Sequence, residues 1–472
     1  MKNSRNFYID GKWVAPQIQR TMSVVNPATE QVFDEISLGT KADVDAAVAA
    51  ASRALASYEL TTPSERIAIF DRIITSYDAR RMDLARTMTT EIGTPLWFSR
   101  DYQVGMALAH FTQARELLKT YLFEYKLGDS VIRREPFGVC GLITAWNWPI
   151  MLITSKVAPA LAAGCTVILK PSEYSALSAI VLAEIMDDAK VPAGVFNLVN
   201  GTGPEVGNAL STHPSISLIS FTGSLQAGAA IAKAAADTVK SVHQELGGKS
   251  ANIILPDADL SVAIPDAVRR GFLNSGQSCI APTRLLVQKD QLAEVIEIAR
   301  TTAEAMTLGD PFSAETRLGP LANAAQQKRV RGFIQTGIEE GATLVCGGAE
   351  MPAGLERGFF IKPTIFCNVT SQMKIAREEI FGPVLSILSY EDEDDAVRIA
   401  NDTTYGLAGY ISSSNLKKAR AVAQRLKAGR IFLNGAATNP VAPFGGYKQS
   451  GNGREWGVFG LEAYLEVKAV IG

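Results

Sequence analysis

The chain of 472 residues is poor in side chains that bind metal ions, with five cysteines and three histidines. No CxxC pair, HExxH motif or Cys/His cluster occurs, so we expect no metal site. The odd number and irregular spacing of the cysteines argue against a disulfide framework. This pattern indicates a reducing compartment, and we expect a cytoplasmic protein.

Net charge is also nearly absent, because 46 basic residues face 48 acidic ones. No global attraction to nucleic acid or to an anionic membrane surface follows from that balance. The N-terminal MKNSRNFYIDGKW lacks the apolar core of a signal peptide. The longest apolar stretch, residues 149–169, is interrupted by Lys156, Pro159 and Gly164. We expect a buried helix and then a buried strand there, not a membrane span.

Length alone favours two or three domains. From Ala42 to about Leu118, apolar residues recur with a helical period, and Thr62 followed by Pro63 is a typical helix start. From Val139 the runs VCGLI, TVILKP, VFNLV and SLISFTG alternate with Ala-rich helical segments. That alternation predicts βαβ units in a parallel sheet. A second α/β block follows, with ANIIL, RLLVQ and PVLSILSY, and a long helix that we expect to reach Leu308.

Three of the expected strands end in residues suited to a dinucleotide. Lys170 and Glu173 follow TVIL, Gly223 and Ser224 lie between a strand and a helix, and NGTGPEVG ends in Gly207. Ligands of open α/β sheets bind beyond the carboxyl ends of the strands, at helix N-termini. Each segment alone is also typical of a structural turn or a helix cap. Together they predict dinucleotide binding.

Catalytic candidates are fewer, and each has a plainer interpretation. Cys279 lies in the polar segment NSGQSCIAPTR, where it is either a nucleophile or a small buried side chain. Glu245 precedes a glycine pair and is either a desolvated base or a surface residue. His243 shares its strand face, and we expect it to be a packing residue. Asn147 before Trp-Pro is either an oxyanion donor or a turn former.

Taken together, these segments resemble the NAD(P)-dependent aldehyde dehydrogenase superfamily. The resemblance runs from Asn26 to the YLEVK segment at Tyr464. In order, its segments are NPATE, WNWP, LKPSE, FTGS, ELGGKSANII, GQSC, EEIFGPV, NDTTYGLAG and PFGGYKQSGNGRE. A non-enzymatic protein that kept only the fold is disfavoured by the intact set of candidate residues.

The resemblance implies a role for each catalytic candidate. Cys279 is similar to the nucleophile of the family, and Glu245 to the general base that activates water. Asn147 is similar to the oxyanion donor, which acts with the backbone N–H of Cys279. Glu455 matches a second acidic position that is proposed to relay protons in some members. A CoA-acylating semialdehyde dehydrogenase is the alternative, and Glu245 argues against it because CoA needs no such base.

The resemblance also implies NAD as the cofactor. Its matching residues are Trp146, Lys170, Glu173, Gly207, Gly223 and Ser224 on the adenosine side, and Glu379 and Phe381 on the nicotinamide side. We favour NAD over NADP, because the Glu173 carboxylate would repel a 2′-phosphate. The expected substrate is a small-molecule aldehyde. Three arginines, Arg100, Arg284 and Arg357, are candidates for contact with a substrate carboxylate.

The fold implied by the resemblance is α/β. A Rossmann-like NAD-binding domain is expected at residues 1–117 and 138–247, and an α/β catalytic domain at 248–449. A small β-ribbon with the C-terminal segment, residues 118–137 and 450–472, is expected to mediate assembly. Members of the family are usually homodimers or homotetramers. Ser155 stands where some members carry a large aromatic residue.

Overall fold

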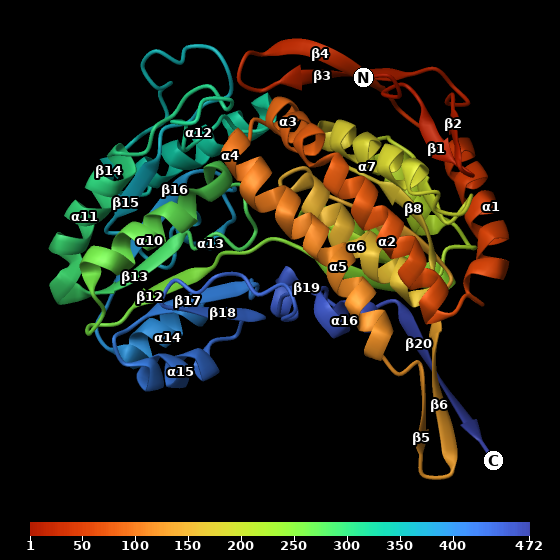
Figure 1. Ribbon diagram of the computed structural model, residues 1–472. Coiled ribbons are helices and arrows are strands. Elements are labelled where there is room, and N and C mark those ends of the chain that lie inside the picture. The colour runs from red at the N-terminus through yellow and green to blue at the C-terminus, as the bar shows by residue number, and fades with distance from the viewer.

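Two large sheets organise the chain in a computed structural model that describes all residues from Met1 to Gly472 (Figure 1). The first sheet has the order β19-β11-β10-β7-β8-β9-β1-β2. Its five central strands are parallel, as the βαβ pattern predicted, and only the edges are antiparallel. The strands are β1 (Phe7–Ile9), β2 (Lys12–Val14), β7 (Val139–Ile143), β8 (Thr166–Lys170), β9 (Phe196–Leu198), β10 (Leu218–Thr222), β11 (Ser241–Glu245) and β19 (Gly451–Asn452).

Helices cover both faces of this sheet. Val167 and Leu169 of β8 pack in one apolar cluster with the helices of one layer, whereas Ile168 packs on the other face against α1. The predicted start at Thr62 is confirmed, because its side chain and that of Glu65 cap α2 reciprocally. The helical segments are α1 (Lys41–Tyr58), α2 (Pro63–Ala79), α3 (Arg81–Ile92), α4 (Leu96–Phe98), η1 (Ser99–Gln103), α5 (Val104–Thr120), α6 (Pro149–Ala163), η2 (Glu173–Ser175), α7 (Ala176–Asp188), η3 (Gly203–Gly207), α8 (Asn208–Thr212), α9 (Leu225–Ala235), η4 (Ala236–Thr238) and α16 (Gly457–Glu462).

The second sheet has the order β14-β15-β16-β13-β12-β17-β18, and only β14 is antiparallel. Leu286 and its neighbours Leu285 and Val287 in β13 pack into different clusters, so this sheet is also covered on both faces. The strands are β12 (Ala251–Ile254), β13 (Arg284–Gln288), β14 (Thr343–Cys346), β15 (Thr364–Cys367), β16 (Val384–Tyr390), β17 (Ala408–Ser412) and β18 (Arg430–Leu433).

The helical segments of this second block are α10 (Leu260–Phe272), η5 (Leu273–Gly276), η6 (Lys289–Gln291), α11 (Leu292–Glu304), α12 (Ala324–Glu339), α13 (Lys374–Arg377), α14 (Glu393–Asn401), α15 (Leu416–Arg425) and η7 (Lys448–Ser450). The helix expected to reach Leu308 was predicted too long. It ends at Glu304, because Leu308 instead forms a bridge with Leu318.

A three-stranded ribbon projects from the molecule, with the C-terminus at its tip (Figure 1). Its strands are β5 (Glu124–Leu127), β6 (Ser130–Pro136) and β20 (Leu465–Ile471). β6 and β20 pair antiparallel over their full lengths, so segments 118–137 and 450–472 contribute to one ribbon. The hairpin of β3 (Thr21–Asn26) and β4 (Gln31–Ser37) stands apart from the large sheets. None of the helices combines the length and apolar character needed to cross a bilayer.

Candidate active site

Cys279 follows a tight turn that begins where α10 ends. Asn274, Ser275 and Gly276 all adopt left-handed backbone conformations, with φ of 54°, 55° and 71°. Such conformations are costly for non-glycine residues and persist only where the surroundings enforce them. A Cβ on Gly276 would lie 2.1 Å from the carbonyl oxygen of Gly382, so only glycine fits there. The turn that presents Cys279 is therefore wedged against the segment that follows Phe381.

Two asparagines tie this turn to the loop after β7. The side-chain amide of Asn274 donates to the carbonyl oxygen of Asn147 at 2.8 Å. The amide of Asn147 donates in return to the carbonyl oxygen of Gln277 at 3.1 Å. A side-chain amide carries two N–H donors, so Asn147 keeps one for another acceptor. The structure thus places Asn147 against the residue two positions before Cys279.

The Cys279 thiol is half-buried among apolar side chains. Its neighbours include Leu407, Phe444, Trp456 and Ile280. Burial raises the pKa of the thiol well above its ordinary value, and the carboxylates of Glu379 and Glu245 add to the rise. The backbone N–H groups of Cys279 and Ile280 act in the opposite direction. A nucleophilic thiolate at this position therefore needs a further positive charge close by.

Glu245 ends β11 and is 4% exposed. Neither carboxylate oxygen has a hydrogen-bond partner in the protein. Burial raises the pKa of Glu245 well above its ordinary value, and the negative charge of Glu455 raises it further. The charges of Lys156, Arg454 and Arg430 oppose that rise. An unpartnered buried carboxylate of raised pKa has the properties of a general base.

Glu455 is held differently from Glu245. Lys156 forms a buried ion pair with one of its oxygens, and the hydroxyl of Ser155 donates to the other at 3.0 Å. Both oxygens are thereby occupied. Ser155 thus contacts this carboxylate.

A glycine pair brings Glu379 close to the nucleophile. The backbone N–H of Gly248 donates to Glu379 Oε1 at 3.0 Å. A Cβ on Gly247 would lie 2.4 Å from Glu379 Oε2, and one on Gly248 would lie 2.3 Å from the carbonyl oxygen of Cys279. Burial raises the pKa of Glu379 to about 7, against the Gly248 bond and the charges of Lys249 and Arg329. The loop after β11 therefore contacts both Glu379 and the Cys279 backbone.

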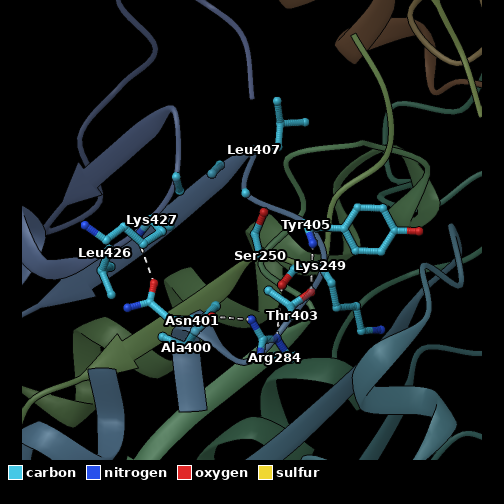
Figure 2. Close-up of a pocket in the computed structure, with 15 residues that line it drawn as sticks. Lys249, Ser250, Arg284, Ala400, Asn401, Thr403, Tyr405, Leu407, Leu426 and Lys427 are labelled. Carbon is cyan, nitrogen blue, oxygen red and sulfur yellow. Dashed lines mark hydrogen bonds between the residues drawn. The ribbon is translucent and has the colours of Figure 1, made fainter. Parts of the chain in front are cut away.

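Arg284 anchors the far end of the same loop (Figure 2). Its guanidinium donates to the carbonyl oxygens of Lys249 at 3.0 Å, Ile399 at 2.8 Å and Ala400 at 2.8 Å. Lys249 is buried beside it, and burial with the Arg284 charge lowers the pKa of Lys249 to about 7. The Lys249 ammonium has no hydrogen-bond partner.

The suggestion that three arginines contact a substrate carboxylate is wrong for Arg284, which is buried and donates from each of its three guanidinium nitrogens to a backbone carbonyl. Arg100 is exposed and paired with Asp101, and Arg357 is also exposed.

Lys170 and Gly207 lie together beyond the strand ends of the first sheet. Lys170 is buried, donates to the carbonyl oxygen of Pro171 at 2.7 Å and pairs with Glu173 at 3.6 Å. A Cβ on Gly207 would lie 3.9 Å from Lys170 Cδ, and a Cβ on Gly203 would meet nothing within 4 Å. The backbone at these glycines is therefore open to close approach by a ligand.

Two further adenosine-side candidates, Gly223 and Ser224, lie between β10 and α9. Ser224 caps α9, because its hydroxyl accepts from the N–H of Ala227 at 3.3 Å. The N–H of Gly223 donates to the carbonyl oxygen of Glu245 at 3.1 Å. This turn is thus fixed directly to the candidate base.

Trp146 and Phe381 meet edge to face, with ring centroids 5.4 Å apart. Phe381 has a left-handed backbone with φ of 63°. Their contact joins the loop after β7 to the segment that carries Glu379.

The model of the Aldehyde dehydrogenase family matches residues 13–470. The chain belongs to the aldehyde dehydrogenase family. A 3-succinoylsemialdehyde-pyridine dehydrogenase from a Pseudomonas species is 52% identical over 473 residues, which cover 100% of this chain and 99% of that protein.

Solved aldehyde dehydrogenases have the same fold. Aldehyde dehydrogenase C of Pseudomonas syringae, a cysteine-to-alanine mutant in complex with NAD+ and octanal, has a TM-score of 0.99 and 53% identity, covering 100% of this chain and 97% of that one. The betaine aldehyde dehydrogenase of Staphylococcus aureus in complex with NAD+ has a TM-score of 0.96 and 36% identity, covering 99% of this chain and 94% of that one.

This aldehyde dehydrogenase also has an apolar wall that the sequence did not reveal. The rings of Phe98 and Tyr102 stack 5.5 Å apart, and Trp148 packs edge-on against Phe98. Met151 packs against this cluster and also against the cluster that includes Cys279. Apolar side chains from distant segments therefore form a continuous surface that ends at the thiol.

Several polar residues of the site were also missed. Lys156 interrupts an apolar run, which was the available signal that it pairs with a buried acid. Gln277 and Gly248 lie inside recognised segments, but only the fold reveals their contacts. Arg430 is buried with its guanidinium 4.6 Å from the centre of the Trp456 ring, and nothing in the sequence near it indicated that position.

Proposed function

We propose that this aldehyde dehydrogenase oxidises an aldehyde to a carboxylic acid with NAD. The observation that carries the proposal is the Glu245–Lys249 loop. It holds an unpartnered carboxylate, packs on the backbone of Cys279 and binds Glu379. Nucleophile, base and cofactor contact are thereby joined by one short loop.

The residues present fit NAD. Lys170, Glu173 and the open backbone at Gly207 suit the adenosine ribose and pyrophosphate, with Ser224 at a helix N-terminus. Glu379 and Phe381 suit the nicotinamide half, and Trp146 suits the adenosine side. The relatives solved with NAD+ support this assignment. When bound, the nicotinamide ring supplies an electron-pair acceptor and a positive charge that favours the Cys279 thiolate.

In the first half-reaction, the Cys279 thiolate adds to the aldehyde carbonyl carbon. The free N–H of Asn147 and the backbone N–H of Cys279 stabilise the oxyanion that forms. Loss of the aldehyde hydrogen with its electron pair leaves a thioester on Cys279. In the second half-reaction, Glu245 takes a proton from water, which attacks the thioester and releases the acid.

The CoA-acylating alternative has no support among these relatives, and the buried base Glu245 gives it none. The apolar wall from Trp148 to Met151 favours an aldehyde with an aliphatic or aromatic tail. The octanal bound to the Pseudomonas syringae relative is of that kind. We propose NAD over NADP because Glu173, paired with Lys170, would repel a 2′-phosphate.

Assembly as a homodimer or homotetramer through the ribbon is part of the proposal. β20 exposes Val470 and Ile471, the latter 82% exposed, and β5 exposes Leu127. Apolar side chains on a projecting ribbon favour association with another copy. We also propose the division into NAD-binding residues 1–117 and 138–247, catalytic residues 248–449, and ribbon and C-terminal residues 118–137 and 450–472, in a cytoplasmic protein.

An aldehyde panel tests the function. Purified protein is mixed with NAD or NADP and with aliphatic, aromatic and carboxylated aldehydes, and reduced cofactor is followed by absorbance. We expect turnover with NAD, highest for uncharged apolar aldehydes, and none in Cys279→Ala. Absence of turnover with every aldehyde, or full activity of Cys279→Ala, would refute the proposal. An absolute requirement for CoA would decide for the alternative.

A further inference from the structure

Glu245 borders a small cavity that Cys279 does not line. This cavity has a volume of about 10 Å³. That volume is near the lower limit for one water molecule. It is lined by Ser220, His243, Gln244, Glu245, Asn452, Arg454, Glu455, Ala463 and Tyr464. The proposed base therefore has a polar outlet away from the nucleophile.

His243 lies in this cavity on the same strand as Glu245. The two residues are two positions apart in β11, so their side chains leave the same face. His243 is half-buried, whereas Glu245 is buried. A Cβ on Gly453 would lie 3.1 Å from His243 Cγ, so the glycine leaves room for the ring. The histidine thus extends from the cavity toward the surface.

The charged groups around His243 favour a neutral ring at neutral pH. Burial lowers the pKa of His243, the charge of Glu455 raises it, and the charge of Lys156 lowers it. Lys156 and Ser155 hold both oxygens of Glu455. The other titratable groups that line the cavity are Glu245, Arg454 and Tyr464. A neutral imidazole with one unprotonated nitrogen can accept a proton.

Hydrolysis of the thioester makes such an acceptor necessary. Each turnover transfers one proton from the attacking water to Glu245, and Glu245 must lose it before the next turnover. On the side of the thiol, Glu245 faces the reacting groups and the apolar cluster around Cys279. The cavity with His243 is the polar alternative, since its lining offers side chains that exchange protons.

We propose that His243 accepts the proton that Glu245 takes from water and passes it to solvent. The proton leaves the Glu245 carboxyl through the cavity for one ring nitrogen, and the N–H of the other nitrogen releases a proton outside. No oxidant or further reactant is needed. The inference rests on the proposed function, because it concerns its hydrolytic step.

The test isolates hydrolysis of the acyl-enzyme. Cys279 is acylated with a p-nitrophenyl ester in the presence of NAD, whose positive charge favours the thiolate, and the burst of p-nitrophenol and the following steady release are recorded. The variants are His243→Gln, which keeps a polar group, and His243→Leu. His213→Gln, a histidine at the end of α8, is the matched control. Thermal unfolding shows whether each variant folds as the parent does.

We expect an unchanged burst in all variants and a steady rate roughly tenfold lower in both His243 variants. This decrease is smaller than the decrease caused by loss of a direct general base. Added imidazole should restore the rate in those variants alone. In the parent, hydrolysis should slow as pH falls below the depressed pKa of His243, and this limb should disappear in His243→Gln. Parental rates and pH profiles in folded His243 variants would overturn the inference. Absence of any Cys279-dependent burst in the parent would instead count against the proposed function.

Discussion

Replacing Glu245 by Gln removes a charge and a base while keeping the side-chain shape. Neither carboxylate oxygen accepts a hydrogen bond from the protein, so no partner is left unsatisfied and the fold should persist. Loss of a general base costs about 10²- to 10⁴-fold in rate. That loss corresponds to about 3 to 5.5 kcal/mol in the barrier to hydrolysis.

The assay separates the two half-reactions. Rapid mixing of Glu245→Gln with NAD and an aldehyde should give a burst of about one reduced cofactor per subunit, because Asn147 and Cys279 remain. The subsequent turnover should fall by the predicted factor. Parental turnover in the variant would refute the assignment of Glu245 as the base that activates water.

The same variant should change the pH dependence of stability. The folded pKa of Glu245 lies well above its ordinary 4.5, so the folded state holds this proton more tightly than the unfolded state. Its contribution to stability is complete below 4.5 and is lost as pH rises through the folded pKa. Chemical unfolding should therefore show that the free energy of unfolding of Glu245→Gln, relative to that of the parent, is higher at pH 8 than at pH 5. An equal difference at both pH values would contradict the buried, perturbed state of this carboxylate.

Four further outcomes follow from the site. Asn147→Ala should lower kcat by roughly 100-fold or more, and it should also lower the unfolding temperature because the buried bond to the Gln277 carbonyl is lost, as measured by steady-state kinetics and thermal scans. Gly276→Ala should abolish activity and lower the unfolding temperature, because its Cβ would lie 2.1 Å from a carbonyl oxygen. Glu379→Gln should raise KM for NAD, and the stability of the parent relative to this variant should fall between pH 4.5 and about 7, where only the folded state keeps the proton. The exposed Glu378→Gln is the matched control for both measurements. Glu173→Ser should improve the use of NADP, and equal NAD and NADP efficiencies in the parent would contradict the role of Glu173.

The general fold was predictable because its strands are buried on both faces. Such strands appear as short apolar runs, and helical segments separate them at regular intervals. The end of the helix before Leu308 could not be predicted in this way. The helical pattern continues to about Leu308, but the helix ends at Glu304, and Leu308 forms a bridge with Leu318 instead. Local sequence carries no information about a partner ten residues away.

The candidate site was predictable only where chemistry and motif coincide. Cys279, Glu245 and Asn147 lie in distinctive segments, and the fold brings those segments together. Lys156 and Arg430 were not predicted, because each is a buried cation whose partner comes from a remote segment. Lys156 pairs with Glu455, and Arg430 lies over the ring of Trp456. Arg284 was assigned the wrong partner for the same reason. The local sequence does not distinguish an arginine that donates to three backbone carbonyls from an arginine that binds a ligand.

The loop after β11 explains why the site needs two consecutive glycines. Glu245 must stay at the strand end, where Gly223 fixes its backbone. The chain must then pass between Glu379 and the carbonyl of Cys279, and a Cβ at Gly247 or Gly248 would lie within 2.4 Å of one or the other. Any larger residue would displace the Glu379 carboxylate or the Cys279 backbone. Glycine is therefore required at both positions by the short distances to Glu379 and to Cys279. We expect Glu245, Cys279 and Glu379 to shift together when either glycine is replaced.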